Sequence, residues 1–378
     1  MKTISAKLYP NAQQERTLIR FLNVGRWTYN RALEHRIKAW KRRGESVNYG
    51  QQQAMLTGWR DRMEFVRIVP VAVERDALRR IDRGFKAFFR RVKAGQKPGF
   101  PRFKGRNHWK SFEVLQHGKY LRDCSRVHIP GVGSVRYRGM QEFSGDIKGV
   151  RVIHKARGWY VQLIVDCGAV PATRPATTRI GIDVGLTTFA TLSNGTKFDN
   201  PRWYRSAQKR LRFLQRIVSR RTKGSKRRRK AVERFARFHE RIADTRKDWT
   251  HKLSRRLVNE FDLIAVEDLN IKGLTRTRLS KSILDAAWNQ FIMQLDYKAA
   301  NAGGRLVRVD PRGTSQECSA CGRTVPKTLN ERTHVCACGY VACRDVNAAR
   351  NVLRRATAEI TRGESTSAGP QRAAGAAR

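Results

Sequence analysis

The sequence is short of acidic residues. Its 378 residues include 31 Asp and Glu against 79 Lys and Arg, which gives a formal net charge of +48 and a pI near 11.3. A chain with this much charge of one sign repels itself unless a polyanion neutralises it, so nucleic acid is the expected partner. An anionic membrane surface is the lesser alternative.

Long apolar runs are also missing, which excludes a transmembrane helix. Runs such as Leu263–Val266 fall far below the roughly 18–20 apolar residues that a bilayer span needs. No apolar block precedes a cleavage site at the N-terminus, so we expect no secretory signal and a cytoplasmic protein. Hydrophobic residues still make up 40% of the chain, enough for folded cores in two or three domains.

Dispersed cysteines are missing too. Of seven cysteines, five fall between Cys318 and Cys343, whereas a disulfide framework would spread an even number through a small secreted domain. We interpret the cluster as a metal site. Its core is two close pairs separated by 14 residues, Cys318 with Cys321 and Cys336 with Cys338. Four thiolates favour tetrahedral Zn²⁺ in a closed structural site.

Neighbouring residues bear on this zinc site. Gly322 and Gly339 follow the two pairs and allow the tight turns that aim backbone amides at the sulfurs. The spacer in the second pair is one residue rather than two. His334 or Cys343 is therefore a conceivable substitute ligand, although the four paired cysteines are the favoured set.

Hydrophobic patterning divides the chain into two halves. Alternation at residues 2–9 predicts a strand, and periodic apolar residues from 12 to about 93 predict helices. Residues 95–175 show glycines, prolines and short alternating runs, which are typical of β structure. We therefore expect a small β-barrel formed by residues 1–10 and 95–175, with a helical insertion at 11–94.

The second half is typical of an α/β domain with helical additions. The expected elements are strands at 179–185, 188–192, 262–268 and 305–309, a basic helical hairpin at 202–260, an amphipathic helix at 281–301 and a helix from Arg344 to about Glu359. The last residues, 361–378, are small and polar, and we expect them to form a disordered tail.

The basic residues concentrate in two segments. Residues 202–256 hold 22 Lys or Arg against four acids, and residues 79–110 hold 12 against one. A solvated helix face normally mixes the two signs of charge, so both segments favour contacts with phosphate.

Aromatic residues interleave the segment 79–110 and suit stacking on bases. The plainer explanation is that these rings belong to the core. Helical spacing favours the core for Phe85, Phe88 and Phe89. The loop at residues 98–104 is instead expected to face RNA or DNA.

Three places in the chain hold an acid next to apolar residues. Asp183 lies inside the apolar segment Ile180–Gly185. Glu267 and Asp268 end a second apolar segment, and Asp345 opens a helix. Acids from two strands and a helix can converge at one edge of a sheet, as a divalent-metal nuclease requires. Mg²⁺ takes oxygen ligands, and two ions about 3.5–4 Å apart activate a water and stabilise the departing oxygen.

Each acid also has a plainer explanation. Backbone amides of the following turn could satisfy Asp183, and Asp345 could be a helix N-cap. Glu267 and Asp268 could cap the next segment. Together these explanations need three coincidences on one strongly basic chain, so we favour the metal site. The spacing does not choose between Glu267 and Asp268.

The same segments resemble the TnpB family of transposon-encoded nucleases, the ancestors of the compact type V CRISPR effectors. The resemblance runs through nearly the whole chain and is carried by Tyr9–Pro10, Tyr29–Leu33, Gly181–Gly185, Val266–Leu269 and Arg344–Asn351, the last three being similar to the RuvC motifs. The resemblance implies an RNase H-like (RuvC) nuclease that uses a guide RNA from the transposon end. Its target would be double-stranded DNA beside a short adjacent motif.

The resemblance also assigns residues and domains. It implies Asp183, Glu267 and Asp345 as ligands of two Mg²⁺ ions, which selects Glu267 over Asp268. The implied domains are a RuvC-like nuclease domain at 176–312 and 344–360 and a zinc ribbon inserted at 313–343. Cys343 departs from the family pattern, because many relatives have an acid two residues before the third catalytic Asp. If that acid helps the site, activity is weakened here.

Two rival functions use the same binding features. One is a nuclease-inactive or weakly active RNA-guided DNA-binding regulator of transposition or transcription, from which only the intact acid triad separates a nuclease. The other is a sequence-specific transposase that works without RNA. We rank it last, because the basic surface exceeds what one duplex site needs.

Overall fold

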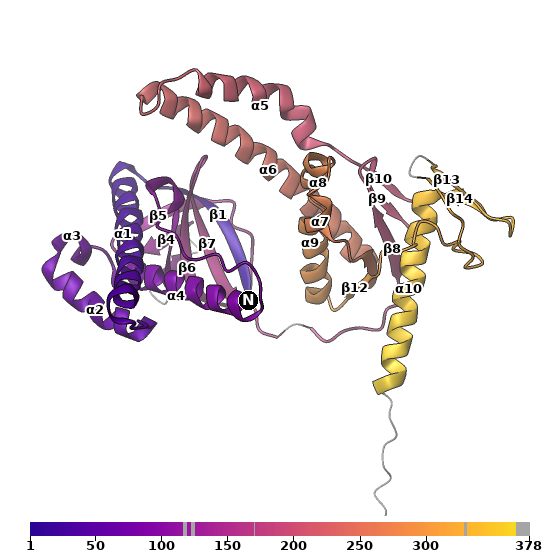
Figure 1. The fold of residues 1–378 in the computed structure, drawn as a ribbon, viewed down its shortest axis with the longest axis horizontal. Helices are drawn as coiled ribbons and strands as arrows, with labels where there is room; N and C mark the ends of the chain where they lie inside the picture. Colours follow the sequence, from indigo (N-terminus) through magenta and orange to yellow (C-terminus); the bar gives the residue numbers. More distant parts are fainter. Residues whose placement is uncertain (116–118, 122–124, 170, 329–330, 368–378) are drawn as a thin grey trace, which may run out of the picture. The chain divides into compact units, whose positions relative to one another are not determined.

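The computed structural model describes residues 1–367 except 116–118, 122–124, 170 and 329–330. The chain forms two compact units, Met1–Gly168 and Ala169–Arg378, each with its own hydrophobic core (Figure 1). Within the described residues, no helix is both long and apolar enough to cross a membrane.

The first unit contains a seven-stranded antiparallel sheet. Its strands are β1 (Lys2–Tyr9), β2 (Ser111–Leu115), β3 (Lys119–Leu121), β4 (Arg126–Ile129), β5 (Gly133–Arg138), β6 (Asp146–Lys155) and β7 (Gly158–Asp166). They are ordered β2-β6-β7-β1-β5-β4-β3. The N-terminal strand thus lies inside the sheet, which explains why a helical segment interrupts one β structure. No pairing of β2 with β3 closes the ladder in the described residues, so the barrel stays a prediction.

Helices fill the interval between β1 and β2, as expected. They are α1 (Ala12–Arg43), α2 (Tyr49–Arg62), α3 (Glu64–Arg67) and α4 (Val71–Lys93), followed by the single 3₁₀ turn η1 (Arg106–His108). A capping box starts α1, because Asn11 and Gln14 exchange side-chain to backbone hydrogen bonds of 2.8 and 3.0 Å. The helix packs on the sheet through an edge contact of Phe21 with Phe112 at 5.5 Å between ring centroids.

The second unit contains a mixed five-stranded sheet. Its strands are β8 (Arg179–Val184), β9 (Thr188–Leu192), β10 (Lys197–Asp199), β11 (Leu263–Glu267) and β12 (Arg305–Val309). The order is β10-β9-β8-β11-β12, with β8, β11 and β12 parallel. Every residue of β11 is buried, as expected for a central parallel strand covered on both faces.

The remaining elements of this unit are helical, apart from one small hairpin. The helices are α5 (Trp203–Ser219), α6 (Lys226–Glu260), α7 (Ile271–Leu274), α8 (Ser280–Ala286), α9 (Trp288–Asn301) and α10 (Arg344–Ser367); the hairpin is β13 (Thr333–Val335) with β14 (Val341–Cys343). The basic hairpin predicted at 202–260 is the antiparallel pair α5 and α6.

Two predictions about helices were wrong. The single helix expected at 281–301 is broken at Ala287, which has φ +54°. Two residues before the break, the carboxylate of Asp285 accepts the backbone N–H of Tyr204 at 2.9 Å and ties α8 to the start of α5. In addition, α10 continues to Ser367, so residues 361–367 are helical rather than a disordered tail. Residues 368–378 of that expected tail lie outside the described residues.

The backbone of α10 lies directly on β8 (Figure 1). A Cβ on Gly181 would lie 2.1 Å from the carbonyl oxygen of Ala349 and 2.9 Å from the backbone nitrogen of Leu353. Only glycine permits this close approach, and it fixes where the start of α10 meets the end of β8.

We expect Gly181→Ala to lower the unfolding free energy of the second unit by about 2–4 kcal/mol, because helix or strand must shift to admit the methyl group. Thermal unfolding monitored by circular dichroism measures this. The control is Gly58→Ala in α2, where nothing lies within 4 Å of the added Cβ and the change is expected to be neutral or slightly stabilising. A Gly181→Ala protein as stable as the parent would contradict the close approach.

Candidate functional site

The first two predicted acids lie at the same edge of the second sheet. In the parallel pair of β8 and β11, Ile182 is in register with Val266, so Asp183 and Glu267 follow side by side. Asp183 is half-buried and Glu267 is buried. Asp268, the alternative to Glu267, is exposed and faces Arg308 at 3.9 Å.

The third acid comes from α10. Ala349 lies over Gly181, and one helical turn back to Asp345 spans about 6 Å. Asp183 lies two strand residues beyond Gly181, about 6.6 Å along β8. Asp345 and Asp183 are thus at similar distances from the contact between Ala349 and Gly181. Asp345 and Asp183 also interact electrostatically. Because Arg344 is the first helical residue, Asp345 lies inside the first turn and is not the N-cap.

The charges of the three acids oppose one another. The pKa of Asp183 is raised to about 8, first because the carboxylate is desolvated and then because Glu267 and Asp345 are near. Arg344 acts in the opposite direction. Carboxylate oxygens whose charges oppose the ionisation of Asp183 are the kind of donor that a hard divalent cation such as Mg²⁺ would accept.

A residue that sequence reasoning missed donates a hydrogen bond to Glu267. The hydroxyl of Thr314 donates to Oε1 of Glu267 at 2.5 Å. Burial raises the pKa of Glu267, and this hydrogen bond acts against burial by stabilising the carboxylate. Thr314 lies 47 residues from Glu267 in the chain, and no spacing rule connects the two.

The four paired cysteines converge as expected. Their sulfurs all lie within 4.8 Å of one another, with Cys318 and Cys338 at 3.8 Å and Cys321 and Cys336 at 3.6 Å. Four sulfurs arranged tetrahedrally at about 2.3 Å from Zn²⁺ would lie about 3.8 Å apart, so the group fits that ion. The two glycines after the pairs have φ of +77° and +85°, which gives the tight turns their left-handed residue.

The surroundings of this cysteine centre act in opposite directions on two of its thiols. The neighbouring cysteines raise the pKa of Cys338 to about 12, whereas the pKa of Cys318 is lowered. Burial raises the pKa of Cys318, but the backbone amides of Cys321 and Ala320 and the side chain of His334 outweigh it and hold the pKa at about 6. His334 is fully buried and contacts Lys327 through Nδ1. The sulfur of Cys343 lies 3.3 Å from Nζ of Lys197, outside the group of four.

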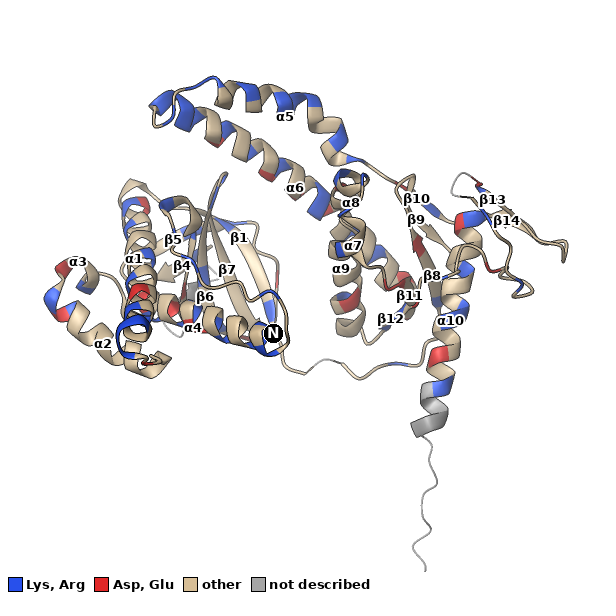
Figure 2. Cartoon of the chain, in the orientation of Figure 1, with Lys and Arg blue, Asp and Glu red and all other residues tan. Residues whose placement is uncertain are grey.

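Basic residues line both arms of the α5–α6 hairpin (Figure 2). Arg212 and Arg216 on α5, and Arg220 as the C-cap of that helix, follow one another at intervals of one turn and border a recess of about 320 Å³. These three side chains are exposed, and no ion pair or hydrogen bond engages them in the described part of the chain.

The aromatic residues after residue 84 are divided between core and surface. Phe85 packs against the first core, as predicted, whereas Phe89 is 53% exposed, so the core prediction was wrong for it. Phe88 is half-buried, and its ring centroid lies 5.3 Å from that of Phe100. Phe100 and Phe103 in the predicted nucleic-acid loop are 47% and 56% exposed.

The cysteine centre predicts a zinc content of about one ion per chain. Cys321→Ser is expected to lose the metal and to destabilise the second unit, because three ligands hold zinc far more weakly than four. Cys343→Ser is the matched control and is expected to keep the ion. Elemental analysis of the purified proteins tests both. Loss of zinc in Cys343→Ser, or its retention in Cys321→Ser, would contradict the assigned ligand set.

The raised pKa of Asp183 predicts a pH-dependent stability in metal-free buffer. The folded state binds the proton more tightly than the unfolded state, so this contribution is full below pH 4 and is lost as pH rises through about 8. In EDTA at pH 8.5, Asp183→Asn is therefore expected to be more stable than the parent by about 2 kcal/mol, or roughly 4–8 °C in Tm. The difference vanishes near pH 4.

The control for this experiment is Asp268→Asn, which removes an exposed carboxylate at the same edge of the sheet. Its thermal stability is expected to stay within about 0.5 kcal/mol of the parent at both pH values. If Asp183→Asn gives no gain at pH 8.5 in EDTA, the Asp183 carboxylate is not desolvated and repelled by its neighbours as described.

Three family models match the chain. They are described as "Probable transposase" (residues 162–278), "Cas12f1-like, TNB domain" (288–352) and "Helix-turn-helix domain" (1–45). In the last range the structure has strand β1 and the single helix α1 followed by its capping glycine, not a pair of helices.

Curated relatives cover nearly the whole chain. "Putative RNA-guided DNA endonuclease InsQ" of Escherichia coli (strain K12) is 31% identical over 98% of this chain and 96% of its own length. "Putative RNA-guided DNA endonuclease" of Streptomyces pristinaespiralis is 36% identical over 92% and 87%. A chain in the cryo-EM structure of a Cas12f1–sgRNA–target DNA complex shares the fold, with a TM-score of 0.56, 13% identity and coverage of 90% and 82%. The chain belongs to the TnpB (OrfB_IS605) family.

Proposed function

We propose that this chain is an RNA-guided DNA endonuclease with a RuvC-type, RNase H-like active site in its second unit. The observation that carries the proposal is the electrostatic interaction of Asp183 on β8 with Glu267 on β11 and Asp345 on α10, in a chain of net charge +48. Relatives that match nearly the whole chain are named for the same activity. The basic surface would bind nucleic acid, and the acids would supply the chemistry.

Asp183, Glu267 and Asp345 would hold the catalytic cations. Mg²⁺ bound there would stabilise charge on the scissile phosphate and activate water for in-line displacement. The chain's own residues prepare the site for this. Thr314 orients the carboxylate of Glu267, and Arg344 supplies a positive charge near Asp183 that partly offsets the repulsion among the acids.

The hairpin of α5 and α6 would contact phosphates. Among the residues that the structure describes, no acid pairs with the exposed row of Arg212, Arg216 and Arg220, so binding a polyanion there breaks no ion pair of the described chain. Such contacts recognise charge and backbone shape, which leaves the choice of sequence to pairing between guide RNA and target. The RNA would come from the transposon end, and a short target-adjacent motif would license cleavage.

The first unit would supply stacking contacts. Phe89, Phe100 and Phe103 are exposed beside a helix and loop rich in Lys and Arg, which is the combination that binds unpaired bases. Arg91 keeps the loop in place, since its guanidinium donates to the carbonyl oxygens of Pro98 and Gly99 at 2.6 and 3.2 Å.

A second candidate function is a weakly active or non-cleaving RNA-guided DNA-binding regulator. Cys343 favours it, because its thiol lies beside Lys197 at the place where many relatives have an acid. This candidate keeps every binding feature described here and predicts RNA-dependent DNA binding without cuts.

The test is plasmid cleavage by protein co-expressed with RNA from its own transposon end, in Mg²⁺, on a target with a randomised flank. Guide-dependent cuts that deplete particular flanks are expected from the parent. Asp183→Ala is expected to lose at least about 10³-fold in rate, because the cation site loses one of its three carboxylates. RNA-dependent binding without cuts would instead establish the regulator, and DNA binding that needs no RNA would overturn both.

A further inference from the structure

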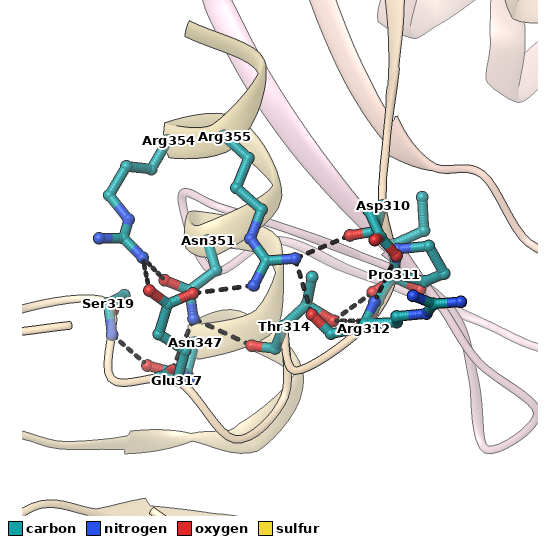
Figure 3. A network of polar contacts seen from close by, with 11 residues as sticks. Asp310, Pro311, Arg312, Thr314, Glu317, Ser319, Asn347, Asn351, Arg354 and Arg355 are labelled. Carbon is teal, nitrogen blue, oxygen red and sulfur yellow. Dashed lines mark hydrogen bonds and ion pairs between the residues drawn. The ribbon is translucent and has the colours of Figure 1, made fainter. Parts of the chain in front are cut away.

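The three acids lie on three separate elements. Two of these elements are β11, which carries Glu267, and α10, which carries Asp345. The structure joins these elements through a third segment, residues 310–319, which leads from β12 into the cysteine centre. This segment is bound on one side to Glu267. On the other side it is bound to α10 (Figure 3). The following inference rests on the proposed function, because it concerns the same cation site.

On the Glu267 side, the contact is the hydroxyl of Thr314. This hydroxyl has one hydrogen and two acceptors, Oε1 of Glu267 at 2.5 Å and the carbonyl oxygen of Pro311 at 3.0 Å. The carboxylate is the stronger acceptor, and 2.5 Å is typical of a charge-assisted bond. Thr314 is 2% exposed and Glu267 is 8% exposed, so water does not replace this contact.

On the α10 side, two buried amides bind the backbone of the segment. Nδ2 of Asn351 donates to the carbonyl oxygens of Thr314 at 2.9 Å and of Glu317 at 2.6 Å. Nδ2 of Asn347 donates to the same carbonyl of Glu317 at 2.7 Å, and its Oδ1 accepts the N–H of Ser319 at 2.9 Å. Because Asn347 is two residues from Asp345, these bonds attach the segment to the turn of the helix that carries Asp345.

Two arginines of α10 complete the attachment. Arg355 donates to the carbonyl oxygens of Asp310 and Arg312, both at 2.8 Å, and to Oε2 of Glu317 at 2.9 Å. Arg354 binds Oε1 of Glu317 at 2.5 Å. The two guanidiniums thus hold both oxygens of one carboxylate and both ends of the turn that contains Thr314.

We propose that Thr314 is a positioning residue of the cation site, which holds the carboxylate of Glu267 in the orientation that binds metal. The attachment to α10 sets the position of Thr314. The same helix carries Asp345. The positions of Glu267 and Asp345 are therefore both set relative to α10, although the two acids come from different elements. Removing a residue that supports a metal ligand in this way typically lowers the affinity for the metal 10–100-fold.

The experiment is Mn²⁺ binding to the full-length protein, measured by the electron paramagnetic resonance signal of free Mn²⁺, which needs no nuclease activity. Four proteins are compared: the parent, Asp183→Ala, Thr314→Val and Thr314→Ser. The site of interest is the binding that the parent has and Asp183→Ala lacks. Thr314→Val, which keeps the shape but not the hydroxyl, is expected to raise the Kd of this site about 10-fold.

Thr314→Ser restores the hydroxyl and is expected to bind within about 3-fold of the parent, while metal-free Tm values of all four proteins distinguish positioning from loss of fold. Binding by Thr314→Val that equals the parent, or binding by Thr314→Ser that is as weak as that of Thr314→Val, would overturn the proposal.

If Thr314→Val does not fold, Arg355→Lys decides. It keeps the charge but loses contacts to the segment, so weaker Asp183-dependent binding supports the proposal and unchanged binding overturns it.

The same titration separates this inference from the proposed function. If the parent and Asp183→Ala bind Mn²⁺ equally, the acids form no cation site and the nuclease proposal fails with the inference. If the parent binds more tightly than Asp183→Ala but Thr314→Val matches the parent, the cation site stands and only the role of Thr314 is rejected.

Discussion

The close approach of α10 to β8 at Gly181 is the constraint on which the second unit depends. A helix that packs on a sheet through side chains lies about 10 Å from it, whereas here the backbones touch because one residue has no side chain. This contact brings the first turn of a helix from the end of the chain to the edge where β8 and β11 finish. The residues between β12 and α10 must then fold against the same helix, and they form the cysteine centre.

The acid site is a small negative region in a strongly positive chain, and this contrast has a chemical meaning. The exposed arginines Arg212, Arg216 and Arg220 would attract phosphate, yet the carboxylates of Asp183 and Glu267 would repel it at the point where bond breaking would occur. A divalent cation resolves the conflict, because it neutralises the acids and presents a positive charge to the phosphate. Without a cation, repulsion by Glu267 and Asp345 contributes to the raised pKa of Asp183.

Local pattern was enough to predict most elements, and long-range contacts account for what it missed. The strands β1, β8, β9, β11 and β12, the helical hairpin and the paired cysteines follow from alternation, periodicity and spacing. The break at Ala287 does not, and beside it Asp285 binds the start of α5, 81 residues earlier in the chain. The position of β1 inside its sheet likewise depends on partners more than 120 residues away.

The acid site shows the same division between local and distant information. The sequence places Asp183 and Glu267 at the ends of apolar strands, and register then brings them together. It does not show Thr314, whose role arises only when the segment before Cys318 folds back on β11 and α10. Identification of the acids therefore required only motifs, whereas identification of what holds one of them required the folded chain.

The attachment of residues 310–319 to Glu267 and to α10 also explains the position of the cysteine centre in the chain. A zinc ion held by Cys318 and its three partners would restrict the conformations of the segment that carries Thr314 and of the turn bound by Asn347. Small modules without a large core commonly gain order from such an ion. Its ligands begin four residues after Thr314 and its last strand runs directly into α10. Order at the cysteines is therefore transmitted along both chain directions to the elements that hold Glu267 and Asp345.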